Sequence, residues 1–385
     1  MIFVQVQNFF RRTLKWAVFF AGLNTFQFPV YARDYADLFA TPRGLSLGGA
    51  LTASVDDRSS LAYNPAGLAL MESQELRLPD LIMAQFSPDI LDVYGKTQSL
   101  DVSGGGLAIA NALREFDGTA VSLGLDLLGM GWYRRQMAIQ FNLLSLNLAL
   151  RVRTPSIFFA RLNAKITTDS GLSFGYAQPF LNNHFRVGFV FRPLLVRAGM
   201  EKVLQNQDIA NLSGIVGEMG VGWGFDGDLG IQGNSPSFSL FGFRLKVLAG
   251  LVLQNLRAED FSGVLKTGLS TQVPPLERRG SAGIALRLDE TRAVVPTLNI
   301  DWREIGVKTD HPIEHLCIGA EFVLQPRTWF RSILRGHFSR AQWGGGIAGR
   351  LAFGELEIGT YAVNLGRGPG VGTHRRNYAS LSARW

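Results

Sequence analysis

From about residue 145 to the C-terminus, apolar residues alternate with polar or small ones. In one stretch Val221, Trp223 and Phe225 share a parity, whereas glycines and an aspartate occupy the positions around them. The same split recurs around Ile300 and around Phe189. A period of two places the two sets of side chains on opposite faces of a strand. The pattern therefore predicts β-strands whose faces meet different surroundings.

Segments with this pattern follow one another closely. The expected strands are 145–153, 156–168, 171–180, 185–197, 215–229, 240–256, 278–289, 292–303, 314–325, 329–340, 344–354, 355–364 and 376–385. Single-chain bacterial barrels usually have an even number of strands, so we expect about 14. The additional strand is predicted at 136–144 or at 75–85. Segments 107–113 and 121–128 fit a helix or a strand equally well.

The links between the expected strands alternate in length. Tight turns are expected at 354–355, 325–327, 290–291 and 154–155, and long links at 366–375, 304–313, 257–277 and 198–214. Outer-membrane barrels combine short periplasmic turns with longer external loops. Closure of the sheet also leaves no unpaired strand edge in hydrocarbon. We therefore predict an all-β fold, a transmembrane antiparallel β-barrel.

The first 32 residues have the layout of a secretory signal peptide. Arg11, Arg12 and Lys15 form a positive region, an apolar run follows at 16–23, and small residues precede an expected cleavage after Ala32. The run is too short to span a bilayer. The sequence therefore predicts export, with the mature chain in the cell outer membrane.

Charge and cysteine content narrow the possible functions. Removal of the three basic leader residues lowers the formal charge of +7 by three, to +4. The remaining basic residues are scattered, so we expect no nucleic-acid partner. The one cysteine, Cys317, excludes an internal disulfide and a cysteine-rich zinc site.

Three motifs follow the leader: the pair Gly48-Gly49, the pair Asp56-Asp57, and Asn64-Pro65-Ala66-Gly67. Over residues 44–68 the chain resembles the FadL/PorV superfamily of outer-membrane proteins. A glycine pair permits close backbone approach, and Asn-Pro favours a turn or a helix start.

The resemblance implies three parts: a signal peptide at 1–32, a hatch or plug at 33–74 and a barrel at 75–385. It implies passive transport of hydrophobic small molecules, with the three motifs in the hatch. The same residues could instead merely close the barrel against leakage. A PorV-like role in protein secretion or anchoring, or a conjugation-associated role, is the alternative that the resemblance leaves open.

The chain ends on an aromatic residue. Leu381, Ala383 and Trp385 share a parity, which resembles the C-terminal signal that the barrel-assembly machinery reads. We therefore expect that machinery, membrane lipid and lipopolysaccharide as partners. Arg367, Arg375 and Arg376, in and after a glycine-rich link, are predicted to meet lipopolysaccharide phosphates.

Two motifs suggest catalysis but lack its context. Residues 44–48 spell GxSxG without the strand and helix that hold a nucleophilic serine. Residues 311–315 spell HxxEH, yet Pro312 and the following alternation favour a loop over the helix of a zinc protease. We therefore predict no enzyme, no metal and no cofactor.

Overall fold

The computed structural model describes most of the chain. The described residues are 38–97, 114, 116–156, 159–205, 220–240, 243–257, 261, 273–288, 293–305, 312–324, 330–339, 342–364 and 373–385. The predicted signal peptide, segment 107–113, His311 and Arg367 lie outside them.

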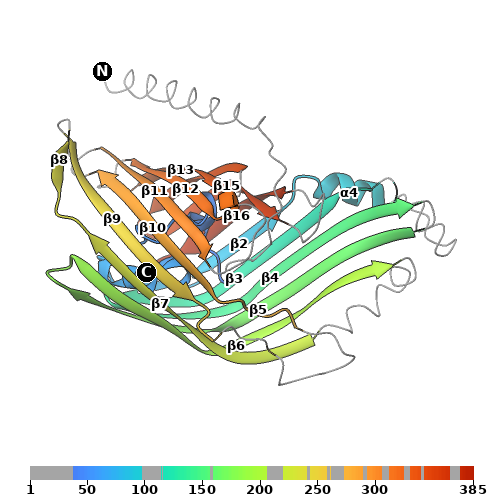
Figure 1. Ribbon diagram of the computed structural model, residues 1–385, viewed down its shortest axis with the longest axis horizontal. Helices are drawn as coiled ribbons and strands as arrows, with labels where there is room; N and C mark the ends of the chain where they lie inside the picture. Colours follow the sequence, from blue (N-terminus) through green and yellow to red (C-terminus); the bar gives the residue numbers. More distant parts are fainter. Residues whose placement is uncertain are drawn as a thin grey trace, which may run out of the picture.

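One antiparallel sheet closes on itself as a barrel of 14 strands, joined by two short strands, β1 and β8 (Figure 1). The strands are β1 (Glu75–Arg77), β2 (Leu81–Phe86), β3 (Ala120–Arg134), β4 (Met137–Ser156), β5 (Phe159–Phe180), β6 (Phe185–Gln205), β7 (Gly220–Asn234), β8 (Phe238–Leu240), β9 (Phe243–Gln254), β10 (Arg279–Leu288), β11 (Val294–Ile305), β12 (Leu316–Leu324), β13 (Arg331–Ser339), β14 (Gln342–Leu351), β15 (Gly354–Asn364) and β16 (Thr373–Ala383).

The two ends of the sheet meet at the first and last strands. β16 pairs with β2, β2 pairs with β3, and β3 pairs with β4. The backbones of Leu76 and Trp385 also exchange hydrogen bonds of 3.1 and 2.8 Å. The last residue of the chain therefore takes part in closing the barrel.

The two faces of the wall differ as the alternation predicts. Trp223, Phe225 and Ile300 point outward and are 46–48% exposed, while Asp301 and Arg192 point inward and are buried. An apolar outer face suits hydrocarbon, and a polar inner face needs partners inside the barrel. The predicted fold class is confirmed.

The predicted strand boundaries need corrections. Segments 156–168 and 171–180 form one strand, β5, because polar Asp169 faces the lumen and pairs with Arg197 at 2.6 Å instead of marking a turn. Segment 145–153 belongs to β4, which begins at Met137. Both candidates for the additional strand are strands, and 121–128 lies in β3.

A β-bulge explains why the sequence pattern breaks within β4. Asn142 and Ser145 pair with Gly171 and Asp169 of β5, so β4 uses one more residue than its partner. Before the bulge the even-numbered Asn142 faces the lumen, and after it the odd-numbered Ser145 does. The phase of the alternation therefore shifts, although the strand continues.

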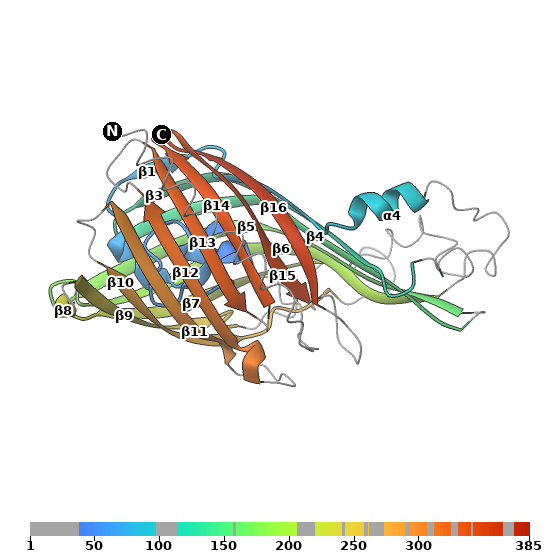
Figure 2. The same cartoon turned by 90° about the horizontal axis from the view of Figure 1, so that it is seen from above.

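The link lengths also differ from the prediction. Thr154 and Pro155 lie within β4, and β4 and β5 are joined across 157–158, at the same end as the long links. Tight connections therefore occur at both ends of the barrel. β4, β5 and β6 have 20, 22 and 21 residues, against nine each in β12 and β13. Their sheet extends well beyond the rest of the wall, toward helix α4 (Ile90–Thr97) (Figure 2).

The N-terminal segment lies inside the barrel. It contains α2 (Pro42–Ser46), α3 (Ser60–Tyr63) and the 3-10 helix η2 (Pro65–Leu70) (Figure 2). A second 3-10 turn, η3 (Pro312–Glu314), precedes β12. No helix in the described residues is long and apolar enough to cross a membrane. We call residues 38–74 the hatch.

Candidate functional site in the lumen

Asn64 joins the hatch to the barrel wall. Its Oδ1 accepts from Ala66 N at 3.1 Å and begins η2, and its Nδ2 donates to Thr52 O at 2.7 Å and to Ile231 O in β7 at 3.1 Å. Its side chain is fully buried. One amide thus caps a helix and fixes two backbones, because it carries two donors and an acceptor.

Glycines in the wall let the hatch backbone approach closely. A Cβ at Gly188 would lie 2.5 Å from Ala66 N and from Pro65 C, and one at Gly230 would collide with Asn64. The hatch backbone contacts wall glycines in the same way at two further strands. Gly250 of β9 lies against Thr52 and Ala53, and Gly319 of β12 lies against Leu47. The hatch therefore packs directly on the wall over a large arc of the barrel.

The hatch glycines of the motifs are tightly surrounded. Gly48 and Gly49 have φ of +61° and +80°, which few other residues adopt at low cost. A Cβ at Gly48 would lie 2.7 Å from His337 and Ser339, and one at Gly49 would collide with Arg303. Gly67 lies against Val55 and Ser60 within the hatch.

Polar side chains of the wall satisfy the irregular backbone of the hatch. Asp301 accepts from Thr52 N at 2.8 Å, Gln254 donates to Ala62 O at 2.6 Å, and His337 Nδ1 donates to Ser46 O at 2.9 Å. Buried backbone groups without partners would be costly. The inward polar residues of the strands thus hold a segment that has little regular structure of its own.

Arg43 is the centre of an ionic network between the hatch and the wall. It makes two hydrogen bonds to Glu321 of β12, at 2.9 and 3.1 Å, and contacts Asp56 at 2.6 Å and Asp57 at 3.2 Å. Glu321 also accepts from Arg335 at 2.7 Å. The network continues from Arg335 to Glu357 (2.6 Å) and from Asp56 to Arg287 (2.8 Å).

The charges around Asp57 favour its ionised form. Burial raises the pKa of this carboxyl, but the nearby Arg43 and Arg350 and a hydrogen bond from Ser59 N lower it further, so the pKa lies well below its usual range. Asp57 therefore stays charged over the whole physiological pH range.

A second ionic contact between the hatch and the barrel is made by Arg58, the residue after Asp57. Arg58 donates to Asp80 Oδ1 at 2.9 Å and to its backbone carbonyl at 2.5 Å. Asp80, between β1 and β2, also accepts from Gln140 at 2.8 Å and from Tyr133. Arg43 and Arg58 thus both tie the hatch to the barrel through buried charges, which are costly when separated.

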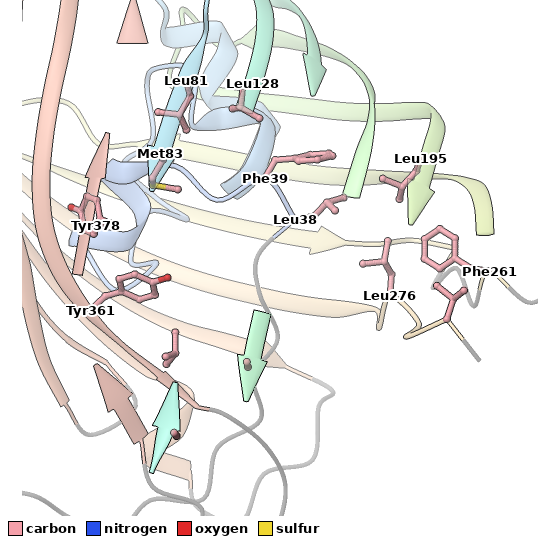
Figure 3. Close-up of a cluster of buried hydrophobic side chains, with 14 residues drawn as sticks. Leu38, Phe39, Leu81, Met83, Leu128, Leu195, Phe261, Leu276, Tyr361 and Tyr378 are labelled. Atoms are coloured by element: carbon pink, nitrogen blue, oxygen red, sulfur yellow. The ribbon is translucent and has the colours of Figure 1, made fainter. Parts of the chain in front are cut away.

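An apolar cluster fills a different part of the lumen, and we call it the apolar layer (Figure 3). Leu45 of the hatch packs against it. Its members share an inward or loop position and low exposure: Leu38, Phe39, Leu81, Met83, Ala120, Leu128, Ala149, Leu195, Phe261, Val273, Leu276, Tyr361, Val363 and Tyr378. The wall is therefore apolar inside as well as outside at this level.

Part of the link between β9 and β10 belongs to the apolar layer. Arg197 of β6 donates to Pro274 O at 3.1 Å, and its guanidinium lies 5.5 Å from the Phe261 ring. Val273 and Leu276 are buried with Phe261. The described part of this link, Phe261 and residues 273–276, therefore packs with inward residues of the wall.

Ser46 and His315, from the two motifs that suggest catalysis, make structural contacts. Ser46 donates to Arg43 O at 3.1 Å within α2, and His337 contacts the carbonyl of Ser46, not its hydroxyl. His315 stacks on Trp302 and donates to Arg303 O at 2.8 Å. No group of three metal-ligating side chains occurs among the residues that the structure describes.

One predicted surface contact is wrong. Arg376 is buried in the lumen and donates to Ser122 Oγ and Asn147 Oδ1 at 2.7 Å each, so it cannot meet external phosphates. Its parity in β16 is that of the inward residues. By contrast, Leu381 and Trp385 of the predicted assembly signal point outward and are 54% and 76% exposed. Their role in assembly stays a prediction.

The sequence did not single out Arg43, Arg58, Glu321, Arg335 or Asp80. Each is a single charged residue among many, and their pairing depends on strands far apart in the chain. The signal that could have found the wall residues is their parity, which places charged residues on the inward face of β12 and β13.

Solved structures of outer-membrane proteins align with most of this chain. The toluene transporter TodX of Pseudomonas putida shares 12% identity, with 93% of this chain and 99% of that chain covered and a TM-score of 0.46. A FadL homologue of Pseudomonas aeruginosa shares 9% identity, with 93% and 99% covered and a TM-score of 0.30. The match is to FadL-family outer-membrane transporters. At these identities the likeness is one of fold.

An enzyme shares the barrel architecture as well. Outer membrane phospholipase A of Escherichia coli shows 10% identity, 82% and 94% coverage and a TM-score of 0.32. The fold alone therefore does not separate transporters from enzymes. No protein-family model matches the chain, and no curated protein matches its sequence.

Proposed function

We propose that this protein carries small hydrophobic molecules passively across the outer membrane and is not an enzyme. The observation that supports this is the apolar layer, in which Leu81, Met83 and Leu128 turn apolar side chains into a lumen that is polar at the hatch. An inward apolar surface gives a nonpolar solute a binding site that water-filled channels lack.

Phe39 supports the same proposal from the hatch side. Its ring is buried among the wall residues of the apolar layer, two residues before the N-cap Thr41 of α2 (Figure 3). An aromatic ring on a short segment can be exchanged for a ligand of similar size. The site is thus occupied by the chain itself when no ligand is bound.

Uptake of radiolabelled dodecane tests this function. Cells that produce the chain should accumulate it faster than cells that lack the gene, and Met83→Gln should slow uptake about tenfold, because the polar amide weakens apolar binding. Met137→Gln is the matched control, since Met137 points outward. Heat-modifiable gel migration measures the folded fraction of each variant. Equal uptake with and without the chain would refute transport.

A second candidate function is partner binding in protein secretion or anchoring, and the extended sheet favours it. About ten residues of a tilted strand suffice to span a bilayer, and β4, β5 and β6 are each about twice that length. The excess gives an external surface for a protein. Crosslinking from cysteines placed on β5 beyond the membrane, with recovery of one defined partner and no effect on dodecane uptake, would favour this role.

A further inference from the structure

The bulge of β4 brings an unusual polar group beside the apolar layer. Asn142 is fully buried, and neither its Nδ2 nor its Oδ1 has a hydrogen-bond partner among the described residues. Phe141 and Leu143 on either side of it point outward, so the Asn142 amide points into the barrel. A buried amide without partners costs free energy that an apolar side chain would avoid.

The position of Asn142 connects it with the proposed site. Its cross-strand neighbour on β3 is Leu128, which belongs to the apolar layer and pairs in turn with Leu81. On the other side the neighbour is Gly171, which has no side chain to offer a partner. Among the described residues, Asn142 is thus an unpaired amide that borders the apolar layer, where a ligand would lie.

We infer that Asn142 binds the hydroxyl group of an otherwise apolar ligand, so that the transported class is hydrophobic alcohols or phenols. This inference rests on the proposed function. A hydroxyl both donates and accepts a hydrogen bond, and the Asn142 amide offers one group of each kind. A pure hydrocarbon would leave the amide unpaired.

The charges next to Asn142 disfavour a carboxylate ligand. In the adjacent row across the three strands, Asp126, Ser145 and Asp169 are direct neighbours. Asp169 pairs with Arg197, but Asp126 accepts only from the neutral Gln85 and Ser145 among the described residues. An additional carboxylate would meet this negative charge, whereas a neutral hydroxyl would not.

Arg376 is a cation that could bind a ligand carboxylate, but its guanidinium already makes buried hydrogen bonds. Arg376, whose charge acts on Asp126, donates to Ser122 and to Asn147. Recruiting it for a ligand would break these buried hydrogen bonds. The arrangement therefore distinguishes a neutral polar head from an anionic one.

Uptake of three probes with the same chain length tests the inference: 1-dodecanol, dodecane and dodecanoate. The full chain should take up dodecanol about tenfold faster than the other two, after subtraction of uptake by cells without the chain. Asn142→Leu should bring dodecanol and dodecane uptake to the same rate, because the apolar side chain offers the hydroxyl no hydrogen bond. Asn299→Leu, a buried inward asparagine of β11 away from the bulge, should leave the ratio as it is.

The outcomes separate this inference from the proposed function. If dodecane enters through the chain but dodecanol has no advantage, or if Asn142→Leu keeps the advantage, the role of Asn142 is refuted and transport stands. Faster uptake of dodecanoate than of dodecanol refutes the ligand class. If none of the three probes enters faster than in cells without the chain, both proposals fail.

Discussion

The hatch and the apolar layer occupy neighbouring levels of one lumen, and they are held by opposite means. At the hatch, charged pairs such as Arg43 with Glu321 and glycine contacts such as Gly188 with Pro65 fix the segment in one position. In the apolar layer, Phe39 and the wall meet through nondirectional apolar contacts.

This difference has a consequence for exchange. Separating a buried charge pair leaves both partners without compensation, so the hatch resists displacement. Apolar contacts are broadly interchangeable, so a ligand of similar volume can replace Phe39 at little cost. In the proposed function, the hatch therefore stays in place while Phe39 is exchanged for the ligand.

Removal of the central guanidinium should have the largest effect on the hatch. Arg43→Met leaves Glu321, Asp56 and Asp57 without their shared cation and should cost about 3–5 kcal/mol of hatch docking. The measurement is protease cleavage of the hatch in the folded, detergent-solubilised barrel. Arg384→Met is the control, because its partly exposed pair with Glu75 is worth at most about 1 kcal/mol. Equal cleavage of the two variants would show that the network does not hold the hatch.

A single methyl group in the wall should also unseat the hatch, by a smaller amount. Gly188→Ala places its Cβ against the backbone of Pro65 and Ala66, which cannot move as a side chain would, and should cost about 1–3 kcal/mol. Single-channel conductance should then show openings that the native protein lacks. Gly233→Ala, whose Cβ would lie 3.6 Å from its closest neighbour, should behave as the native protein.

Removal of a side chain from the apolar layer should increase uptake and leave the hatch in place. Phe39→Ala empties the position while the hatch contacts remain, so dodecane uptake should rise, by up to about tenfold if the ring and the ligand compete for the same place. Phe39→Leu should retain the native rate because it keeps most of the apolar volume. Unchanged uptake in Phe39→Ala would mean that the ring does not lie on the ligand route.

Acid should loosen the hatch and leave the apolar layer unchanged, and this is the smallest of the expected effects. Because the folded-state pKa of Asp57 is lowered from 3.8, its stabilisation is complete above that value and is lost as the pH falls below it. Hatch cleavage should therefore stay constant from pH 9 to about pH 5 and rise only in stronger acid. Asp57→Asn should weaken this dependence on pH, and Glu321 retains its own share because it also pairs with Arg43. A rise in cleavage near neutral pH would assign the effect to another group.

The sequence predicted the barrel because period-two alternation reports directly which face of a strand meets hydrocarbon. The prediction of strand boundaries failed where polar residues face the lumen. Asp169 looks like part of a turn but lies inside β5, and the bulge after Asn142 reverses the parity of β4. The predicted count of 14 strands was correct for a mixed reason. The division of β5 into two strands added one strand too many, and this was offset because 75–85 and 121–128 both proved to be strands.

The candidate site was predictable in part. Gly48, Gly49 and Asn64 have local signatures, and the structure places each against the wall. The partners of Arg43 and the members of the apolar layer come from strands up to hundreds of residues apart. No local pattern reports such contacts, because they depend on how the cylinder closes.

The backbone bonds between Leu76 and Trp385 join residues that lie far apart in the sequence. Pairings of such long sequence separation carry the largest loop-closure entropy and form late. The hatch lies inside the barrel whose wall this seam helps to close. We therefore expect the strands to close around the hatch, rather than the hatch to enter a finished barrel.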